Sequence, residues 1–491
     1  VKKFEYKNKS GIILEGHKQK WKLIFYAVET RDHHFERIDQ IILSQKEAKQ
    51  NRFGSFAPIR LNNFVSFQLN AKNYYKDLYE QINNAKESVM IQGWWISPEL
   101  YLLRPIEGNE NSRLDILLKK KASEGVQIKI MIYKENKTFL PNNSKHTEEV
   151  LSNLHPNITV IKNRDGDFSH HEKAVIIDFN LLYLGGIDLC LGRYDTCKYP
   201  LTDKARELKR QYYPAKDYSN ARLMDFKNVN LPFENMQDRN KDPRMPWHDA
   251  QLKIVGPSVK DVLFQFVERW NFIVRTKYAD NEISMILFPT EVNEEFYETK
   301  IEASRGPEDR HLRCQILRSA AGWSSGLPVK ECSILNGYLH MVKYSKHNVY
   351  VENQFFITST GESDVSIENE IGKAIVERIL RAHKEGKKWA ALITIPLQPA
   401  FPSEVNKTGG GSLRHIISRQ NMSISIGENS IFGKLYKKGI NPANYLLFMS
   451  MRTWAEIGPQ SDLVTTQIYV HSKLIFADNC KCIVGSANIN D

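Results

Sequence analysis

The chain has 491 residues, of which 41% are hydrophobic and 25% charged, and its formal net charge at pH 7 is +11. This length allows two or three globular units, and the composition argues against a disordered chain. The excess of Lys and Arg indicates an anionic partner, either nucleic acid or an acidic lipid surface. A solvated basic surface without a partner is the alternative.

No apolar run approaches the roughly 18 residues that indicate a membrane span. The N-terminal residues lack the apolar core of a signal peptide, and because the first residue is not Met we treat the chain as a fragment. None of the six cysteines has C-x-x-C spacing. We therefore expect free thiols in a reducing, cytoplasmic compartment.

In chain order, residues 1–45 show short alternating segments typical of β-hairpins. From about residue 52, helical patterns alternate with strand patterns, which favours an α/β architecture with helices covering a mostly buried sheet. A turn-rich loop at 195–247 divides two such halves. The expected helices are 74–87, 113–125, 258–274, 333–346 and 370–388, and the expected strands are 88–97, 126–135, 347–358 and 389–396.

The frame His-x-Lys-x-x-x-x-Asp occurs twice, 300 positions apart (471 − 171). The match continues past the Asp, where Gly185 and Gly485 are equivalent, as are Gly186 and Ser486. A repeat of this kind implies two copies of one structural unit. The six matched residues are His171, Lys173, Asp178, His471, Lys473 and Asp478.

Within a strand, a His and a Lys two residues apart point to the same face. Two such pairs facing each other form a pocket suited to a phosphodiester: the lysines neutralise phosphate oxygens, one imidazole attacks phosphorus and the other moves the proton. This chemistry requires no metal, because the side chains supply the positive charge. The alternative is two surface His–Lys pairs from a duplication that retained no chemistry.

Several motifs together resemble a known family, the HxKxxxxD phospholipase D superfamily, and within it the eukaryotic phosphatidylcholine-hydrolysing type. They are "RFGSFAPIR", "GWWISPE", "HHEKAVIID", "PRMPWHD", "YVENQFFI", "YVHSKLIFAD" and "GSANIND", and they extend from about Arg52 to the end. The resemblance implies two pseudo-symmetric α/β/α sandwich lobes with mixed sheets that share one active site. The expected domains are a partial, β-rich pleckstrin-homology-like tail at 1–50, a first lobe at 51–257 and a second lobe, truncated at its C-terminus, at 258–491.

By the same resemblance, His171 is the nucleophile and His471 the general acid/base, or the two roles are exchanged. Lys173 and Lys473 would hold the phosphate. Asp178 and Asp478 belong to the catalytic motifs and are expected to brace the fold around the lysines. The further candidates for the substrate and phosphate site are Asn488, Ser486, Asp188, Glu352, Asn353 and Gln354.

Carboxylates that orient the two imidazoles are also implied. Asp203 is the candidate for His171, and the acid for His471 is expected beyond Asp491. Asp188 replaces the Asn of the second copy, and since an anion would repel phosphate, a structural or His-facing role is expected for it. The candidates for phosphoinositide binding are Arg269, Arg275, Lys277, Arg378, Arg381 and Lys384.

The expected function is hydrolysis of phosphatidylcholine to phosphatidic acid and choline through a phosphohistidine, with transfer to primary alcohols. The alternatives are a nuclease or cardiolipin-type phosphodiesterase of the superfamily, and a catalytically dead lipid-binding scaffold. The resemblance further implies a monomer at the cytosolic face of a membrane, activated by phosphatidylinositol bisphosphate. Small GTPases and protein kinase C are implied partners, and nucleic acid is not.

Overall fold

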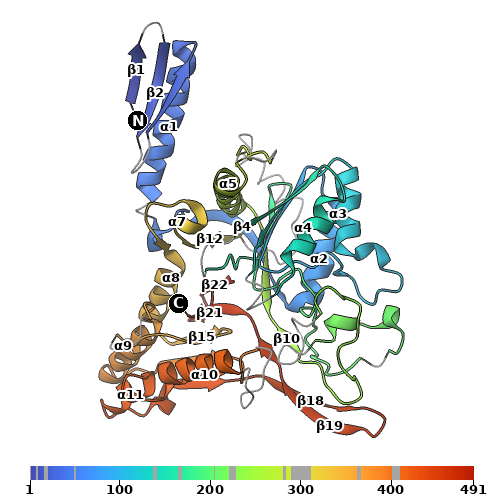
Figure 1. The fold of residues 1–491 in the computed structure, drawn as a ribbon. Helices are drawn as coiled ribbons and strands as arrows, with labels where there is room; N and C mark the ends of the chain where they lie inside the picture. The colour runs from blue at the N-terminus through green and yellow to red at the C-terminus, as the bar shows by residue number, and fades with distance from the viewer. Residues whose placement is uncertain are drawn as a thin grey trace.

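The computed structural model describes residues 2–6, 9–15, 20–48, 51–135, 141–163, 168–203, 205–219, 228–279, 283–288, 311–361, 367–400 and 410–490. Figure 1 shows two lobes that lie against each other and a small N-terminal module that projects away from both. Within the described ranges, no helix has the length and apolar character to cross a bilayer.

The N-terminal module is an antiparallel sheet of β1 (Lys2–Tyr6), β2 (Lys9–Glu15) and β3 (Lys20–Phe25), followed by helix α1 (Val28–Ala48). The β-rich prediction is correct for the first part only, because residues 37–45 lie in α1 rather than in a strand. Their apolar residues Ile38 and Ile42 continue from Phe35 at helical spacing.

The first lobe is built on an eight-stranded mixed sheet in the order β12-β4-β11-β9-β8-β5-β6-β7. Helix α5 covers one face, and Tyr74 of α2 packs against Tyr183 on the other. The strands are β4 (Arg60–Leu69), β5 (Ser88–Gly93), β6 (Gln127–Tyr133), β7 (Ile158–Asn163), β8 (Ala174–Ile177), β9 (Leu181–Gly185), β11 (Ala250–Val255) and β12 (His311–Cys314), and the helices are α2 (Asn70–Asn84), α3 (Leu114–Ser123), α4 (Ser144–Ser152) and α5 (Ser258–Lys277).

The expected boundary at residue 257 differs from the structure. Helix α5 buries Val259, Phe266 and Trp270 in the first-lobe core, and β12 pairs with β4 at the edge of the same sheet. The first lobe therefore extends at least to Cys314. An amphipathic pattern predicts the helix but does not tell which sheet its apolar face covers.

The second lobe repeats the central part of the first. Its five-stranded sheet has the order β17-β16-β15-β21-β22, which matches β7-β6-β5-β8-β9 strand for strand, parallel pairs included. The predicted internal repeat is thus confirmed. The strands are β15 (Asn348–Glu352), β16 (Ala390–Thr394), β17 (Leu446–Met449), β21 (Lys473–Ala477) and β22 (Lys481–Gly485), and the helices are α8 (Ser333–Tyr344), α9 (Ile371–Lys384), α10 (Gly411–Ile424) and α11 (Ile431–Tyr436).

Short elements connect and decorate the lobes. Strand β10 (Trp247–His248) of the first lobe pairs with β20 (Tyr469–Val470) of the second, so backbone hydrogen bonds join the two lobes next to His471. The remaining elements are β13 (Ser319–Ala320), α7 (Gly322–Ser325), β14 (Glu331–Cys332) and the hairpin of β18 (Arg452–Ile457) and β19 (Asp462–Gln467).

The motif aspartates show the repeat most directly. Asp178 accepts hydrogen bonds from the backbone N–H groups of Lys86, Glu87 and Ser88 at 2.8–2.9 Å, where β5 begins. Asp478 does the same at β15, with three backbone N–H groups at 2.7–3.1 Å. Both aspartates therefore brace the strand starts, as expected. They follow the ends of β8 and β21, whereas the lysines stand where these strands begin, which corrects the expected place of the aspartates among the catalytic residues.

Candidate active site

The two His–Lys pairs meet at the interface of the lobes. His171 and Lys173 lead into β8, while His471 and Lys473 lead into β21, the equivalent strand of the second lobe. The centroids of the two imidazole rings are 6.4 Å apart. The predicted single site with two imidazoles and two ammonium groups is therefore confirmed.

His171 is held by a neutral group. Its Nδ1 lies 3.0 Å from the backbone carbonyl oxygen of Ser486. Because a carbonyl can only accept, Nδ1 carries the hydrogen and Nε2 of the neutral ring keeps its lone pair. This tautomer suits a nucleophile.

The prediction that Asp203 orients His171 is wrong. The Asp203 carboxylate accepts hydrogen bonds from the backbone N–H of Ala205 at 3.3 Å and of Tyr213 at 2.8 Å. It therefore braces its own loop. A turn residue with this role cannot be told from a catalytic carboxylate by spacing alone.

His471, by contrast, is held by a carboxylate. Its Nδ1 lies 2.6 Å from Oδ2 of Asp249, which is 1% exposed and precedes β11 of the first lobe. The expectation that this acid lies beyond Asp491 is therefore wrong. Backbone and indole N–H donors, from Ala250 at 2.9 Å and Trp247 at 3.2 Å, keep the buried carboxylate in place.

Gly186 makes room for this carboxylate. A Cβ atom at position 186 would lie 2.1 Å from Oδ1 of Asp249, so only glycine fits. The equivalent position of the second copy holds Ser486. The Gly–Ser difference between the copies was a visible signal in the sequence that a group packs closely against the first turn.

Burial and neighbouring cations act on both imidazoles. Burial, followed by Lys173 and Lys473, lowers the pKa of His171 well below its ordinary value. Burial also lowers the pKa of His471, with further contributions from Lys473 and Arg193. The neutral imidazole is therefore the favoured resting form of His171.

Hydrogen-bond acceptors orient the side chains of the two lysines. Lys173 Nζ donates to the carbonyl oxygen of His171 at 2.8 Å and lies 3.3 Å from Asp188 Oδ2. Lys473 Nζ donates to the carbonyl oxygen of His471 and to Gln354 Oε1, the latter at 3.2 Å. Asp188 therefore pairs with Lys173 and does not bind phosphate, and Gln354 positions Lys473.

Similarity to known proteins identifies the family of this chain. Residues 81–491 match the family model described as Phospholipase D. The chain belongs to the phospholipase D family.

Among similar proteins, Phospholipase D1 of Saccharomyces cerevisiae (strain ATCC 204508 / S288c) is 42% identical over 486 residues, covering 98% of this chain and 29% of the relative. Phospholipase D1 of Schizosaccharomyces pombe (strain 972 / ATCC 24843) is 42% identical over 455 residues, with 90% and 33% covered. A solved phosphatidylserine synthase of Haemophilus influenzae Rd KW20 is 11% identical, with 88% of this chain and 80% of that chain covered and a TM-score of 0.45. The chain thus spans about a third of the length of the two yeast relatives.

Two further candidates of this phospholipase D-family chain, Glu352 and Asn353, form hydrogen bonds with other protein groups. Glu352 accepts hydrogen bonds from Tyr350 at 2.6 Å and from Ser472, and it contacts Nε2 of His248 at 2.8 Å. Asn353 Oδ1 accepts from the backbone N–H of Phe355 and Ile489. Both were predicted to bind substrate; in the structure Glu352 joins the second lobe to His248 of the first, and Asn353 supports the second lobe.

Ser486 lies beside His171, and Asn488 follows Ser486 by two residues in the chain. The Ser486 carbonyl is already used by His171. Asn488 Oδ1 is buried, and none of the described groups donates a hydrogen bond to it. The role of Asn488 at the phosphate stays a prediction.

Aromatic rings fix the two imidazoles. The Trp94 ring centroid lies 5.8 Å from that of His171, and the Trp247 centroid lies 4.7 Å from that of His471. The guanidinium carbon of Arg193 is 3.9 Å from the Trp247 centroid. Sequence reasoning missed Trp247 and Arg193, although the "PRMPWHD" motif contains both Trp247 and Asp249.

The basic candidates divide into two groups. Arg269 is 3% exposed and pairs with Glu172, and Arg378 is 4% exposed and donates to backbone carbonyls of Ser345 and Lys346. Burial excludes these two arginines from contact with a membrane, contrary to prediction. The exposed candidates are Arg275, Lys277, Arg381 and Lys384.

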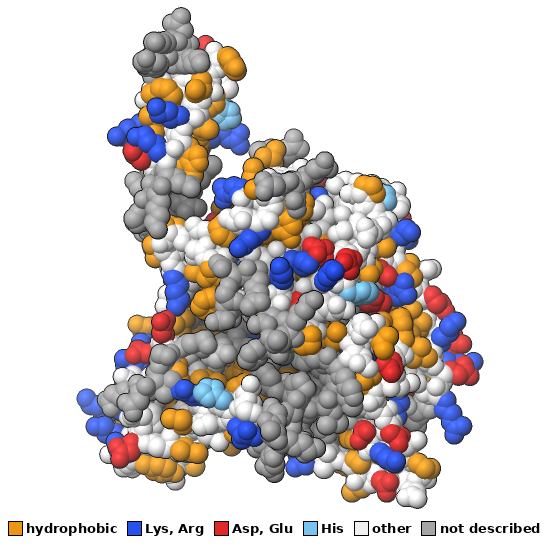
Figure 2. All heavy atoms as spheres, viewed as in Figure 1, with side chains coloured by type: hydrophobic (Ala, Val, Ile, Leu, Met, Phe, Trp, Pro, Cys, Tyr) orange, Lys and Arg blue, Asp and Glu red, His pale blue; other side chains and the backbone are white. Residues whose placement is uncertain are grey.

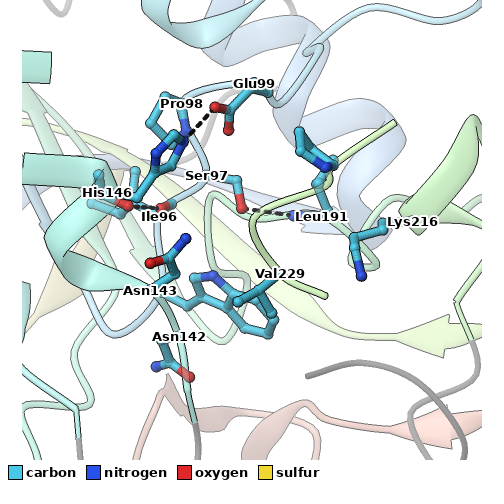
Figure 3. A pocket seen from close by; sticks show the side chains of 13 residues that line it. Ile96, Ser97, Pro98, Glu99, Asn142, Asn143, His146, Leu191, Lys216 and Val229 are labelled. Carbon is cyan, nitrogen blue, oxygen red and sulfur yellow. Dashed lines mark hydrogen bonds and ion pairs between the residues drawn. The ribbon is translucent and has the colours of Figure 1, made fainter. Parts of the chain in front are cut away.

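Two cavities lie near the site. One cavity, drawn in Figure 3, has a volume of about 20 Å³, which is room for about one water molecule. Trp95, His146 and Glu99 line it, and the His146 and Glu99 side chains contact each other at 2.6 Å. The other, of about 740 Å³, is mostly apolar and lies on the α5 side of the first sheet, where Glu172 and Lys473 reach its wall. The imidazole rings line neither cavity.

Proposed function

We propose that the chain carries the active site of a phospholipase D that hydrolyses phosphatidylcholine to phosphatidic acid and choline. The observation that carries this proposal is the pair of imidazoles 6.4 Å apart, one held by a carbonyl and the other by a carboxylate. Family membership and the similarity to proteins named Phospholipase D1 support the substrate class.

In the first step, Nε2 of His171 attacks phosphorus. The new P–N bond forms as the P–O bond to choline breaks, and His471 gives its proton to the departing choline oxygen. Asp249 stabilises the imidazolium form of His471. The anionic substrate also offsets the lysines that lower the pKa of this His.

In the second step, His471 takes a proton from water, whose oxygen attacks phosphorus and breaks the P–N bond. A primary alcohol in place of water yields a phosphatidyl alcohol. Lys173 and Lys473 neutralise the phosphate oxygens throughout, and Asn488 donates to one of them. The scheme requires no metal because these side chains supply the positive charge.

The proposed location is the cytosolic surface of a membrane, with phosphatidylinositol bisphosphate as activator. The exposed cations Arg275, Lys277, Arg381 and Lys384 are the proposed contacts. Action as a monomer and regulation by small GTPases and protein kinase C rest on family resemblance alone.

The test is incubation with labelled phosphatidylcholine and ethanol, with labelled single-stranded DNA as a parallel substrate. The expected products are phosphatidic acid and phosphatidylethanol in vesicles, with the DNA intact. Cleavage of DNA with phosphatidylcholine untouched would overturn the substrate class. Phosphatidic acid formed without any phosphatidylethanol would overturn the covalent intermediate.

A further inference from the structure

The hairpin of β18 and β19 projects from the second lobe at the lower right of Figure 1. Two of its large apolar side chains point into solvent: Trp454 is 69% exposed and Leu463 is 71% exposed. Figure 2 shows hydrophobic, basic and acidic side chains close together in this part of the surface. Two large apolar side chains exposed on one small hairpin indicate a binding surface, because neither is buried in a hydrophobic core.

The strand register places both side chains on one face. Trp454 lies opposite Thr465, and Leu463 is two residues from Thr465 on the same strand. Arg452, opposite Gln467, belongs to this face and is exposed, as does Glu456, which lies opposite Leu463. The face therefore joins an indole and a leucine to a guanidinium, with one carboxylate beside them.

The base of the hairpin extends this face. Gln467, which shares it, exchanges hydrogen bonds of 3.0 Å with the backbone N–H and carbonyl of Gln398. The preceding residue, Leu397, is 61% exposed. We define the hairpin face as Arg452, Trp454, Glu456, Leu463 and Thr465.

This face is directly connected to the catalytic residues. Strand β19 ends at Gln467 and is followed by β20 and then by His471. The Tyr469 ring lies 6.3 Å from that of His471, and its hydroxyl accepts a hydrogen bond from Gln354, which holds Lys473. A partner bound to the hairpin face therefore contacts a strand that ends four residues before His471 (471 − 467).

We propose that the hairpin face docks onto the surface of a phospholipid bilayer and thereby presents lipid phosphates to the site between the lobes. Indole rings favour the boundary between acyl chains and headgroups, and leucine enters the acyl region beside them. Arg452 contacts lipid phosphates, and the chain's formal charge of +11 complements an anionic membrane. The inference rests on the proposed function in one respect, since it takes the substrate to be a bilayer lipid.

The test compares the full chain with the double variant Trp454→Ala/Leu463→Ala. Binding is measured by sedimentation with vesicles of phosphatidylcholine containing a minor fraction of phosphatidic acid. Hydrolysis is measured on the same vesicles and on monomeric short-chain phosphatidylcholine. A matched control, Tyr436→Ala/Leu447→Ala, removes side chains that are 60% and 52% exposed on α11 and β17.

The hairpin variant is expected to bind vesicles about tenfold more weakly or worse, because it loses two large apolar side chains at the interface. Its hydrolysis of vesicles falls in parallel, whereas its hydrolysis of the monomeric lipid and its melting temperature are unchanged. The control variant matches the parent in every measurement. The single variants Trp454→Ala and Leu463→Ala each give part of the loss, which excludes a fold-wide effect.

Equal vesicle binding by the parent and the hairpin variant overturns the proposal, and the face then serves a protein partner. Absence of vesicle binding by the parent also overturns it. If the parent hydrolyses neither form of phosphatidylcholine while the binding loss is seen, the proposed function fails and the docking surface stands.

Discussion

Asp249 of the first lobe places its Oδ2 2.6 Å from Nδ1 of His471 in the second lobe. The carboxylate fixes the tautomer and stabilises the positive ring, as expected for a general acid. Asp249→Asn keeps the size of the side chain but removes this charge. We expect kcat to fall by about 10³- to 10⁴-fold, by analogy with the loss of an orienting carboxylate elsewhere.

Steady-state hydrolysis and thermal unfolding of Asp249→Asn test this expectation. Asp203→Asn is the matched control, since the hydrogen bonds that Asp203 accepts from the described residues come from backbone N–H groups, and its kcat is expected to stay within a few-fold of the parent. Equal losses in the two variants would show that Asp249 has no special role at His471.

Gly186→Ala probes the same carboxylate from the opposite side. The added methyl group would lie 2.1 Å from Asp249 Oδ1 and must displace it. We expect kcat to fall at least about tenfold, as a misplaced catalytic group typically does. Gly485→Ala, where a Cβ meets nothing within 4 Å, is the control and should retain the parent rate.

A substrate with a good leaving group can distinguish the roles of the two imidazoles. A phosphatidyl ester of p-nitrophenol needs little protonation of its leaving oxygen. His471→Ala should therefore release a burst of p-nitrophenol equal to the enzyme concentration, with phosphohistidine accumulating. His171→Ala should release none. A burst in His171→Ala and not in His471→Ala would exchange the two roles.

Asp178 and Asp478 should matter for stability rather than chemistry. Each accepts three hydrogen bonds from backbone N–H groups. Their replacement by Ala is expected to cost about 1–3 kcal/mol in the free energy of unfolding, because three backbone donors at each strand start lose a charged acceptor. Denaturant titration measures this loss, and a folded variant with a greatly reduced kcat would contradict the structural role.

Buried histidines predict acid sensitivity. Burial lowers the pKa of His170 to about 2, and burial also lowers the pKa of His171 and His471. Above pH 6.5 these rings are neutral in both the folded and the unfolded chain. Below it only the unfolded chain binds the protons, so stability is lost as the pH falls.

For His170 alone, the loss is about 1.4 kcal/mol for each pH unit below 6.5. Melting temperatures measured between pH 7.5 and about 5 should fall accordingly. His170→Asn should show a shallower decline than the parent. An identical pH dependence in the two proteins would mean that the pKa of His170 is the same in the folded and the unfolded chain.

The features that occur in both halves of the chain could be predicted from the sequence, whereas a functional residue that occurs in one half only was missed. The two His–Lys frames, the matching Gly turns and the alternation of helices and strands revealed both sheets and the shared site. Asp249 has no repeated counterpart in the chain and contacts His471 across 222 positions. Only the folded arrangement of β10 beside β20 brings the two together.

The sequence also did not show which charged residues are buried. Arg269 and Arg378 lie on helices with other basic residues, a pattern that usually indicates an exposed face. Their partners, Glu172 and the backbone carbonyls after α8, are distant in sequence. Such pairing depends on the packing of α5 and α9 against other elements. The hydrophobic periodicity of the sequence gives no information about that packing.

The separation of Asp249 and His471 along the chain also has a consequence for synthesis. Domains generally form from the N-terminus as the polypeptide leaves the ribosome. The first lobe can then fold while its carboxylate and His171 are present, yet the proton donor has not been translated. A nascent chain that ends before His471 holds only one of the two imidazoles, so we expect the proposed site to be inactive until residue 471 has been translated.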